Sequence, residues 1–165
     1  MAVLPDLLRP GLDIVFCGTA AGTKSAQRGM YYAGPGNKFW RTLHELGLMD
    51  APVPPASFDE LARRRFGLTD LAKLEFGMDR QLSRNAFDID KLRKKIAENQ
   101  PRILGFNGKK AGQAFFGGPV AYGLQQARIG ETMIYVLPST SGAANGFWDV
   151  TVWLSLAPIL GARTI

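Results

Sequence analysis

The stretch FCGTAAGTKSA, residues 16–26, places a glycine-rich turn with a lysine and a serine directly after an apolar run. Phosphate-binding P-loops have the form G-x-x-x-x-G-K-[ST], in which the lysine follows the last glycine and reaches the β- and γ-phosphates. In this chain Gly18 and Gly22 are one residue too close, and Thr23 separates Gly22 from Lys24. The loop is therefore a poor ATP site. The backbone N–H groups of this loop follow a strand, and they can bind a polar or anionic group.

Two other loops carry polar side chains after apolar runs. NGKKA, residues 107–111, follows RILGF, and PSTSGAANG, residues 138–146, follows TMIYVL. In a parallel α/β sheet, ligands bind beyond the carboxyl ends of the strands. We therefore expect these two loops and the glycine-rich loop to meet in one site.

The chain has few soft metal ligands. Its one cysteine, Cys17, excludes internal disulfides and cysteine-ligated clusters, and its one histidine, His44, lies in a helical pattern. The sequence contains no tight group of carboxylates that could replace them. We therefore expect chemistry without a metal or a cofactor.

The balance of charge favours a polyanionic partner. The 165 residues carry a net charge of +6, and the pI is about 9.7, which points first to nucleic acid and second to an anionic membrane. No apolar stretch is long enough to cross a membrane, and Pro5 and Asp6 interrupt any signal-peptide core. We expect a cytoplasmic monomer without a membrane partner.

The elements that must position the three loops alternate between strand and helix. Short apolar runs predict strands over residues 13–17, 67–71, 102–106 and 132–138. Helical spacing predicts helices over residues 37–48, 58–66, 88–101, 108–118 and 147–160. Ser57 and Glu60 form a capping box for the second of these helices. The alternation predicts an α/β fold, a three-layer α/β/α sandwich with a central, mainly parallel sheet, and residues 1–165 are expected to form a single domain.

Four segments resemble, in their order, the motifs of the mismatch-specific uracil-DNA glycosylase and thymine-DNA glycosylase family. They are VFCGTAAG, YYAGPGNKFW, NQPRILGFNGK and VLPSTSGAANG. The resemblance covers most of the chain, and the block G-P-G-N-x-F-W is its most specific part. It implies a uracil-DNA glycosylase-like sandwich whose partner is DNA containing uracil, single- or double-stranded. Such an enzyme flips the base out and hydrolyses its N-glycosidic bond without a metal.

The resemblance also implies a base pocket. Tyr32 is similar in position to the aromatic residue that stacks on the flipped base, a contact worth about 1–3 kcal/mol. Ser25 stands where uracil-selective relatives carry serine and thymine-processing relatives carry alanine, with helix capping as the alternative role. The expected base-binding residues are Gly18, Ala20, Ser25, Tyr32, Thr69 and Ser139.

The first motif departs from the family pattern G-I-N-P-G, in which the asparagine holds the attacking water. This chain has Ala20 at that position, and losing such a hydrogen-bonding group costs about 3–4 kcal/mol. Ser139 is a candidate to hold the water instead, as are the three expected catalytic residues, Thr19, Asp70 and Asn107. We expect activity, because the base can leave as an anion before water attacks. A weak or inactive DNA-binding relative is the alternative, and a small-nucleotide-binding protein is a third reading.

The last loop differs from the family as well. Relatives place a bulky leucine or arginine there to fill the space left by the extruded base, whereas this chain has Ala143 and Ala144. Discrimination by the opposite base should therefore be weak. Phe147 or Trp148 is a substitute wedge, with core packing as the alternative. The expected DNA-binding residues are Lys24, Lys109, Lys110, Ser141, Gly142, Ala143 and Asn145.

Overall fold

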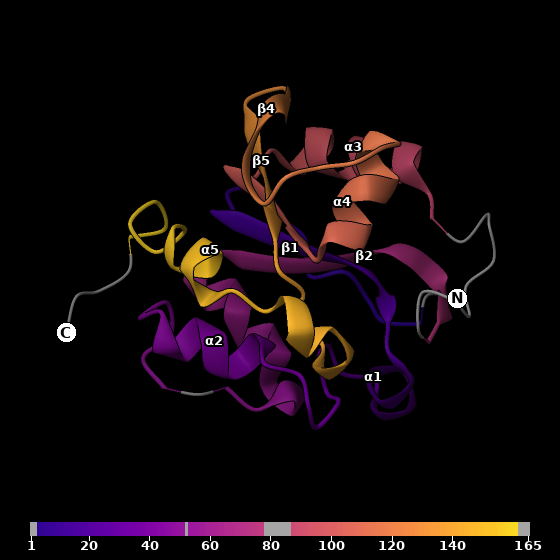
Figure 1. Ribbon diagram of the computed structural model, residues 1–165, viewed down its shortest axis with the longest axis vertical. Helices are drawn as coiled ribbons and strands as arrows, with labels where there is room; N and C mark the ends of the chain where they lie inside the picture. The colour runs from indigo at the N-terminus through magenta and orange to yellow at the C-terminus, as the bar shows by residue number, and fades with distance from the viewer. Residues whose placement is uncertain (1–2, 52, 78–86, 162–165) are drawn as a thin grey trace.

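The computed structural model describes residues 3–51, 53–77 and 87–161. Over these residues a five-stranded sheet crosses the molecule in the order β2-β1-β3-β5-β4 (Figure 1). β1 (Ile14–Ala21) pairs in parallel with β2 (Phe66–Phe76) and β3 (Ile103–Asn107), and β3 pairs in parallel with β5 (Thr132–Leu137). The edge strand β4 (Gly123–Ile129) runs antiparallel to β5. The prediction of a mainly parallel sheet is confirmed.

Helices cover both faces of this sheet (Figure 1). α3 (Ile89–Asn99) and α4 (Lys109–Phe116) pack on one face. The other face carries α2 (Phe39–Glu45), the 3-10 helix η1 (Pro55–Arg64) and α5 (Val150–Leu154). Two short elements, α1 (Thr23–Arg28) and the 3-10 helix η3 (Gly142–Phe147), follow β1 and β5. The predicted three-layer α/β/α sandwich is therefore also confirmed.

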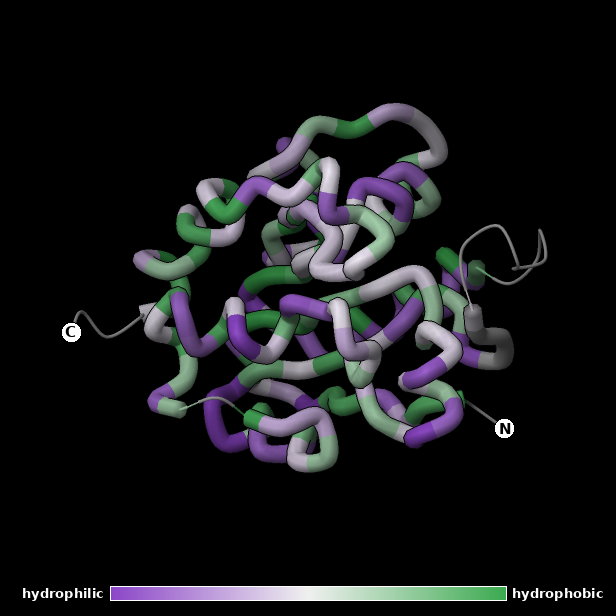
Figure 2. The backbone as a smooth tube through the Cα atoms, turned by 60° about the horizontal axis from the view of Figure 1, so that its bottom comes forward, coloured by the Kyte–Doolittle hydropathy of each residue, from purple (hydrophilic) through white to green (hydrophobic). Residues whose placement is uncertain are grey.

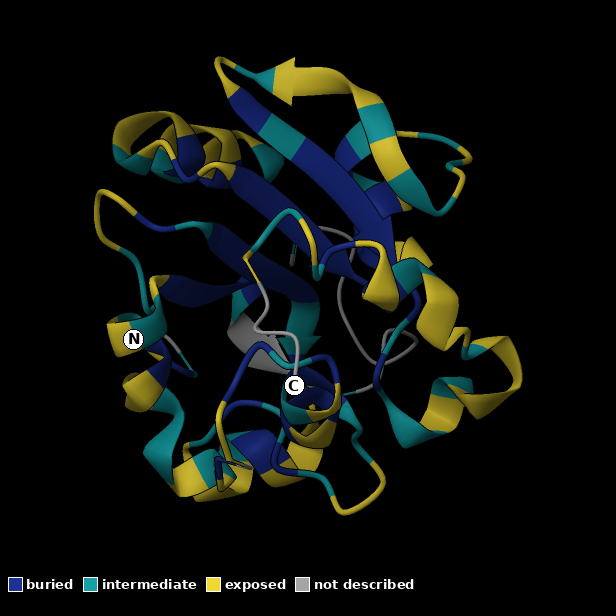
Figure 3. Cartoon of the chain, turned by 90° about the vertical axis from the view of Figure 1, so that its left-hand side faces the viewer, coloured by how far each residue is buried: buried dark blue, intermediate teal, exposed yellow. Residues whose placement is uncertain are grey.

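Successive side chains of the central strands supply two separate cores. Ile14 and Phe16 of β1 pack on the α2 side, whereas Val15 and Cys17 pack on the side of α3 and α4, and all four are fully buried. Figure 3 shows the central strands buried along their length, while β4 at the edge carries exposed residues. A parallel strand covered on both faces needs apolar residues at every position. For this reason the continuous apolar run within residues 13–17 correctly predicted a buried strand.

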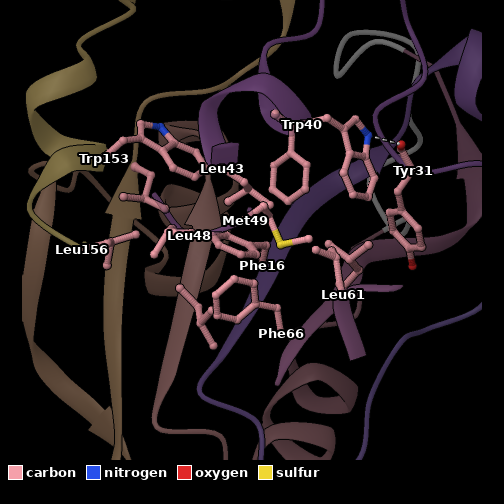
Figure 4. Close-up of a cluster of buried hydrophobic side chains, with 14 of the residues drawn as sticks. Phe16, Tyr31, Trp40, Leu43, Leu48, Met49, Leu61, Phe66, Trp153 and Leu156 are labelled. Atoms are coloured by element: carbon pink, nitrogen blue, oxygen red, sulfur yellow. Dashed lines mark hydrogen bonds between the residues drawn. The ribbon is translucent and has the colours of Figure 1, made fainter. Parts of the chain in front are cut away.

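Aromatic side chains fill the core between the sheet and α2 (Figure 4). Phe16 stacks on Trp153 with ring centroids 5.7 Å apart and meets Phe39 edge-on at 5.2 Å. Two of the three tryptophans, Trp40 and Trp153, also anchor loops through their indole N–H groups. Trp40 Nε1 donates to the Tyr31 carbonyl at 3.0 Å, and Trp153 Nε1 donates to the Pro138 carbonyl at 2.9 Å. The core thereby fixes the chain on both sides of the candidate site.

Several element predictions were wrong in detail. The capping box does not form, because η1 begins at Pro55 and Ser57 itself has a non-helical backbone. The closing helix is shorter than predicted, since α5 covers only Val150–Leu154. β4 was missed because its sequence, GLQQARI, is mostly exposed and lacks an apolar run. The extra residues of β2, up to Phe76, lie beyond the apolar stretch that predicted it.

Figure 2 shows hydrophobic stretches along the strands near the centre of the molecule, whereas hydrophilic and hydrophobic segments alternate along the surrounding helices and loops. Among the described helices none is both long and apolar enough to cross a membrane.

Candidate active site

The carboxyl end of β1 and the loops after β1, β3 and β5 meet in one cavity of about 740 Å³. The sequence predicted that these three loops would meet, but its prediction that the first strand ends at residue 17 was wrong, because residues 18–21 belong to β1 and Gly18 and Ala20 pair with β2. The turn that contains Tyr32 completes its wall. The predicted site residues that line this cavity are Gly18, Thr19, Ala20, Lys24, Ser25, Tyr32, Asp70, Asn107, Lys109, Lys110, Ser139, Ser141, Gly142 and Ala143. Asn145 and Thr69 do not line it. Residues far apart in the chain therefore form one concave surface at the carboxyl end of the sheet.

A carboxyl group, that of Asp70, lies in the floor of the cavity. The β1–β2 register places Asp70 beside Gly18, and a Cβ atom at Gly18 would lie only 2.9 Å from Asp70 Oδ1. Only 5 % of the residue is exposed. Burial raises the pKa of Asp70 from 3.8 to about 7, although the positive charges of Lys73 and Lys95 and the Gly18 backbone act in the opposite direction. A carboxyl that changes charge near neutral pH in a cleft is a functional-site signal.

Tyr32 stands against this carboxyl in a strained backbone conformation. Its φ is 53°, a left-handed value that bulky side chains rarely adopt. One face of its ring stacks on Phe39 with centroids 4.2 Å apart, and the ring also lines the cavity. Burial, with the Asp70 charge second, raises the pKa of the Tyr32 hydroxyl well above its ordinary value, while the Asn107 amide acts in the opposite direction. The structure therefore presents an aromatic ring to the cavity and directs its hydroxyl to the floor.

Asn107 binds the neighbouring loop with both ends of its amide. Its Nδ2 donates to Thr140 Oγ1 at 2.9 Å, and its Oδ1 accepts from the Thr140 backbone N–H at 3.0 Å. Both residues are buried. An asparagine amide has two donor hydrogens and two acceptor lone pairs, so one of each is used here. Asn107 therefore holds the β5 loop in place beside the cavity and keeps limited capacity for a ligand.

The two serines of the predicted base pocket are also hydrogen-bonded. Ser25 Oγ accepts from the Ala33 backbone N–H at 2.9 Å, which joins α1 to the turn after Tyr32. The alternative of helix capping is wrong, because Gly22 occupies the N-cap of α1. Ser139 Oγ accepts from the Ser141 backbone N–H at 3.2 Å. Both hydroxyls still border the cavity.

Thr69 does not line the cavity, and its side chain joins an ion-pair cluster that no local sequence pattern predicts. Its Oγ1 donates to Asp6 Oδ1 at 2.7 Å. The same carboxylate binds Lys73 Nζ at 2.8 Å and Lys95 Nζ at 2.6 Å. Asp6 and Lys95 are far apart in the chain, so no local pattern connects them. The cluster fastens the N-terminal segment and α3 to β2, next to Asp70.

The mouth of the cavity is basic and partly aromatic. Lys24, Lys109 and Lys110 are exposed there, and Lys109 Nζ lies 4.5 Å from the centre of the Tyr122 ring. Phe147 lines the mouth and is 74 % exposed. Trp148 is partly buried against the core, where Lys38 Nζ lies 5.2 Å from the centre of its ring. Trp148 therefore packs on the core, whereas Phe147 does not.

Two glycines bring the walls of the cavity together. A Cβ atom at Gly142 would lie 3.2 Å from the Gly36 carbonyl oxygen, so the two backbones are in direct contact. The Lys38 backbone N–H donates to the Thr140 carbonyl at 2.8 Å, and the Lys38 side chain binds Asn145 Oδ1. The turn after Tyr32 and the loop after β5 thus form one continuous wall.

The arrangement joins an aromatic face, a carboxyl that titrates near neutral pH, the backbone at the carboxyl end of β1 and a basic rim. Over the described residues, no three His, Cys, Asp or Glu side chains are grouped so as to hold a metal ion. Such a cavity suits a flat heterocycle attached to a phosphate backbone, with acid–base chemistry from protein side chains.

Fold and site thus define an α/β protein whose ligand cavity lies at the carboxyl ends of parallel strands. The family model described as the uracil DNA glycosylase superfamily matches residues 5–154, and the chain belongs to that superfamily. Its structure is similar to the solution NMR structure of a "putative Uracil DNA glycosylase" from Methanosarcina acetivorans. The two chains share 26 % sequence identity with a TM-score of 0.63, and the match covers 96 % of each. Glycosylase-like function follows from this membership.

Proposed function

We propose that this protein is a monofunctional uracil-DNA glycosylase of the mismatch-specific and thymine-DNA glycosylase branch. It hydrolyses the N-glycosidic bond of uracil in DNA and leaves an abasic site. The observation that carries the proposal is the buried Asp70 carboxyl in the floor of a cavity whose other walls are the Tyr32 ring and the Gly18–Ala20 backbone.

The pocket binds the base by stacking and by backbone hydrogen bonds. Uracil lies against the cavity face of Tyr32, whose opposite face is held by Phe39. The backbone N–H groups at the carboxyl end of β1, beyond the last pair with β3 at Cys17, bind the uracil oxygens, and they do so most strongly when the base leaves as an anion. Ser25, at the junction of α1 and the Tyr32 turn, borders the C5 side of the base and so opposes the methyl group of thymine.

The reaction runs in two steps. The bond between C1′ and the base nitrogen breaks, its electron pair leaves with uracil, and the sugar becomes an oxocarbenium ion. Water then adds to C1′, and its proton passes to the Asp70 carboxylate. Before that transfer, the negative charge of Asp70 also stabilises the oxocarbenium ion. Because departure of the base comes first, Ala20 removes one water-binding group without abolishing the reaction.

The rim binds the DNA strand. Lys24, Lys109 and Lys110 contact phosphates, which should make binding strongly salt-dependent. In η3 the small Ala143 and Ala144 leave Phe147 as the large apolar side chain that can enter a duplex where the base has left. Asn145 contributes by holding Lys38 and the shape of this loop.

The decisive experiment incubates uracil-containing oligonucleotides with excess protein under single-turnover conditions. Alkali then breaks the strand wherever uracil has been released, and the cleaved fraction is measured. We expect uracil release from single- and double-stranded DNA in the presence of EDTA. Matched oligonucleotides with cytosine or thymine in place of uracil are the controls. DNA binding without release at enzyme excess would favour the inactive DNA-binding relative. A protein that neither binds DNA nor releases uracil would contradict both hypotheses.

A further inference from the structure

The Tyr32 hydroxyl is the one buried side-chain oxygen or nitrogen in the described part of the chain that has no hydrogen-bond partner. Buried polar atoms of folded proteins are almost always paired, and an exception calls for a physical explanation such as a catalytic role. The other buried tyrosine beside it, Tyr31, follows the rule, because its hydroxyl donates to the Pro5 carbonyl at 2.8 Å. The unpaired hydroxyl of Tyr32 is therefore a specific feature of the cavity floor.

This hydroxyl and the Asp70 carboxyl lie on the same side of Gly18. The point that a Cβ atom of Gly18 would occupy lies 3.5 Å from the Tyr32 hydroxyl oxygen and 2.9 Å from Asp70 Oδ1. Stacking on Phe39 and the left-handed backbone at Tyr32 hold the ring in this orientation. A strained conformation persists only where the surroundings enforce it, and such positions cluster at functional sites.

Two of the other candidates to hold the attacking water, Asn107 and Ser139, are less free. Asn107 already binds Thr140 with its donor and its acceptor, and the Ser139 hydroxyl accepts from Ser141. Ala20 has no polar side-chain atom. Among the cavity-lining hydroxyls, that of Tyr32 is buried and has no hydrogen-bond partner by distance and angle, and the nearby Asn107 amide and Asp70 carboxyl both act on its pKa.

We propose that the Tyr32 hydroxyl and the Asp70 carboxylate together hold the water that attacks C1′, replacing the group that Ala20 lacks. The inference rests on the proposed glycosylase function and adds a second role to a residue whose ring stacks on the base. The hydroxyl donates a hydrogen bond to the water oxygen, and the carboxylate accepts from the water. When the water oxygen bonds to C1′, its proton passes to Asp70 and Tyr32 keeps its own.

The surroundings support a protonated tyrosine. Burial and the Asp70 charge raise the pKa of Tyr32 well above its ordinary value, so it remains a donor at every working pH. The ionisable groups that act on Asp70 are Lys73, Asp6 and Lys95, and Cys17 is buried nearby with a raised pKa. Of these groups, only Asp70 is both a cavity-lining residue and ionisable near neutral pH.

The test is Tyr32→Phe, which keeps the ring and removes only the hydroxyl. We expect single-turnover uracil release from single-stranded DNA to fall about 10- to 100-fold, the usual effect of losing one hydrogen bond to a charged site. DNA affinity should stay unchanged, and the melting temperature should be equal or higher because the hydroxyl has no partner to lose. Tyr32→Ala should lose affinity as well as rate. The matched control is Tyr135→Phe, a buried tyrosine of β5 outside the cavity.

A double-mutant cycle with Asp70→Asn makes the inference sharper. If both groups hold one water, the two substitutions should be strongly non-additive in rate. Parental rates in Tyr32→Phe, or additive losses, would overturn the inference and leave the proposed function intact. A slower Tyr32→Phe with weakened DNA binding would also overturn it, because the hydroxyl would then serve the base. A parent protein that releases no uracil would overturn both.

Discussion

At the scale of single residues, the site depends on a carboxyl that the fold makes costly to ionise. Asp70 is buried next to Gly18, and the absence of a side chain at Gly18 is what lets the carboxyl come so close to the strand. Active sites commonly keep such unfavourable groups because function needs them, at the expense of stability. The same residue should therefore influence activity and stability in opposite directions.

Asp70→Asn should lower the rate of uracil release and raise stability. The pKa of Asp70 is about 7 in the folded protein and 3.8 in the unfolded chain, so the folded state loses stability as pH rises between these values. Each pKa unit corresponds to about 1.4 kcal/mol, and asparagine avoids this cost because it carries no ionisable group. The variant should melt higher than the parent at pH 8, with a smaller difference at pH 5.

The parental rate should rise with pH to a plateau above 7, and this rise should disappear in the variant. Asp90→Asn, an exposed carboxylate of α3, is the control.

Ser25→Ala should shift selectivity towards thymine. The hydroxyl that crowds the thymine methyl is removed, and one methyl group in a shaped pocket is worth about 1–3 kcal/mol. The change also leaves the Ala33 N–H without its acceptor, so the melting temperature should fall. Single-turnover rates on matched oligonucleotides with uracil or thymine opposite guanine measure the effect. An unchanged rate ratio would remove Ser25 from the base pocket.

At the scale of elements, the loops after the parallel strands act as one wall because they bind each other. Asn107 of β3 holds Thr140, and Gly36 touches Gly142. The wall ends in η3, where Phe147 is exposed while the neighbouring Trp148 packs on the core. The rigid part of this loop thus presents a single large aromatic side chain at the cavity mouth.

Phe147→Ala should reduce uracil release from duplex DNA by about tenfold or more and leave single-stranded DNA nearly unaffected. The reason is that only a duplex has a stacked position to fill when the base leaves, and unstacking costs a few kcal/mol. Rates on the same sequence in single- and double-stranded form give the comparison. Leu154→Ala, an exposed apolar residue of α5 outside the cavity, is the control. Equal losses on both substrates would show that Phe147 does not act as a wedge.

At the scale of the whole molecule, two apolar layers and one ion-pair cluster hold the sheet that carries the site. The clusters on the two faces fix β1 and β3, whose carboxyl ends supply Gly18 and Asn107. Asp6, bound to Lys73, Lys95 and Thr69, ties the N-terminal segment and α3 to β2. The position of Asp70 on β2 thus depends on contacts among three distant parts of the chain.

Asp6→Asn should destabilise the protein by about 1–3 kcal/mol at pH 7, since it leaves two partly buried lysines without their carboxylate. The lysines lower the pKa of Asp6 below 3.8 although burial opposes them, so its stabilisation is present above pH 3.8 and is lost as pH falls further. Chemical unfolding at pH 7 and at pH 3 tests this, and the difference between parent and variant should shrink at the lower pH. Asp50→Asn, at the exposed pair with Arg64, should change stability by less than about 1 kcal/mol.

The sequence by itself determined the fold class and the three site loops. Parallel strands such as β1 must be apolar at every position, and their carboxyl ends lie at one edge of the sheet, so local patterns were sufficient. The sequence could not reveal β4, because an exposed edge strand has no apolar signature. It also could not rank Asp70 above Asn107 or separate Thr69 from the cavity, because these depend on contacts between distant residues. Only the tertiary structure set Gly18 against Asp70, left the Tyr32 hydroxyl unpaired and placed the partly buried Asp6 between two lysines. Burial and charge pairing are properties of the packed chain, and they decided which polar residues remain available for chemistry.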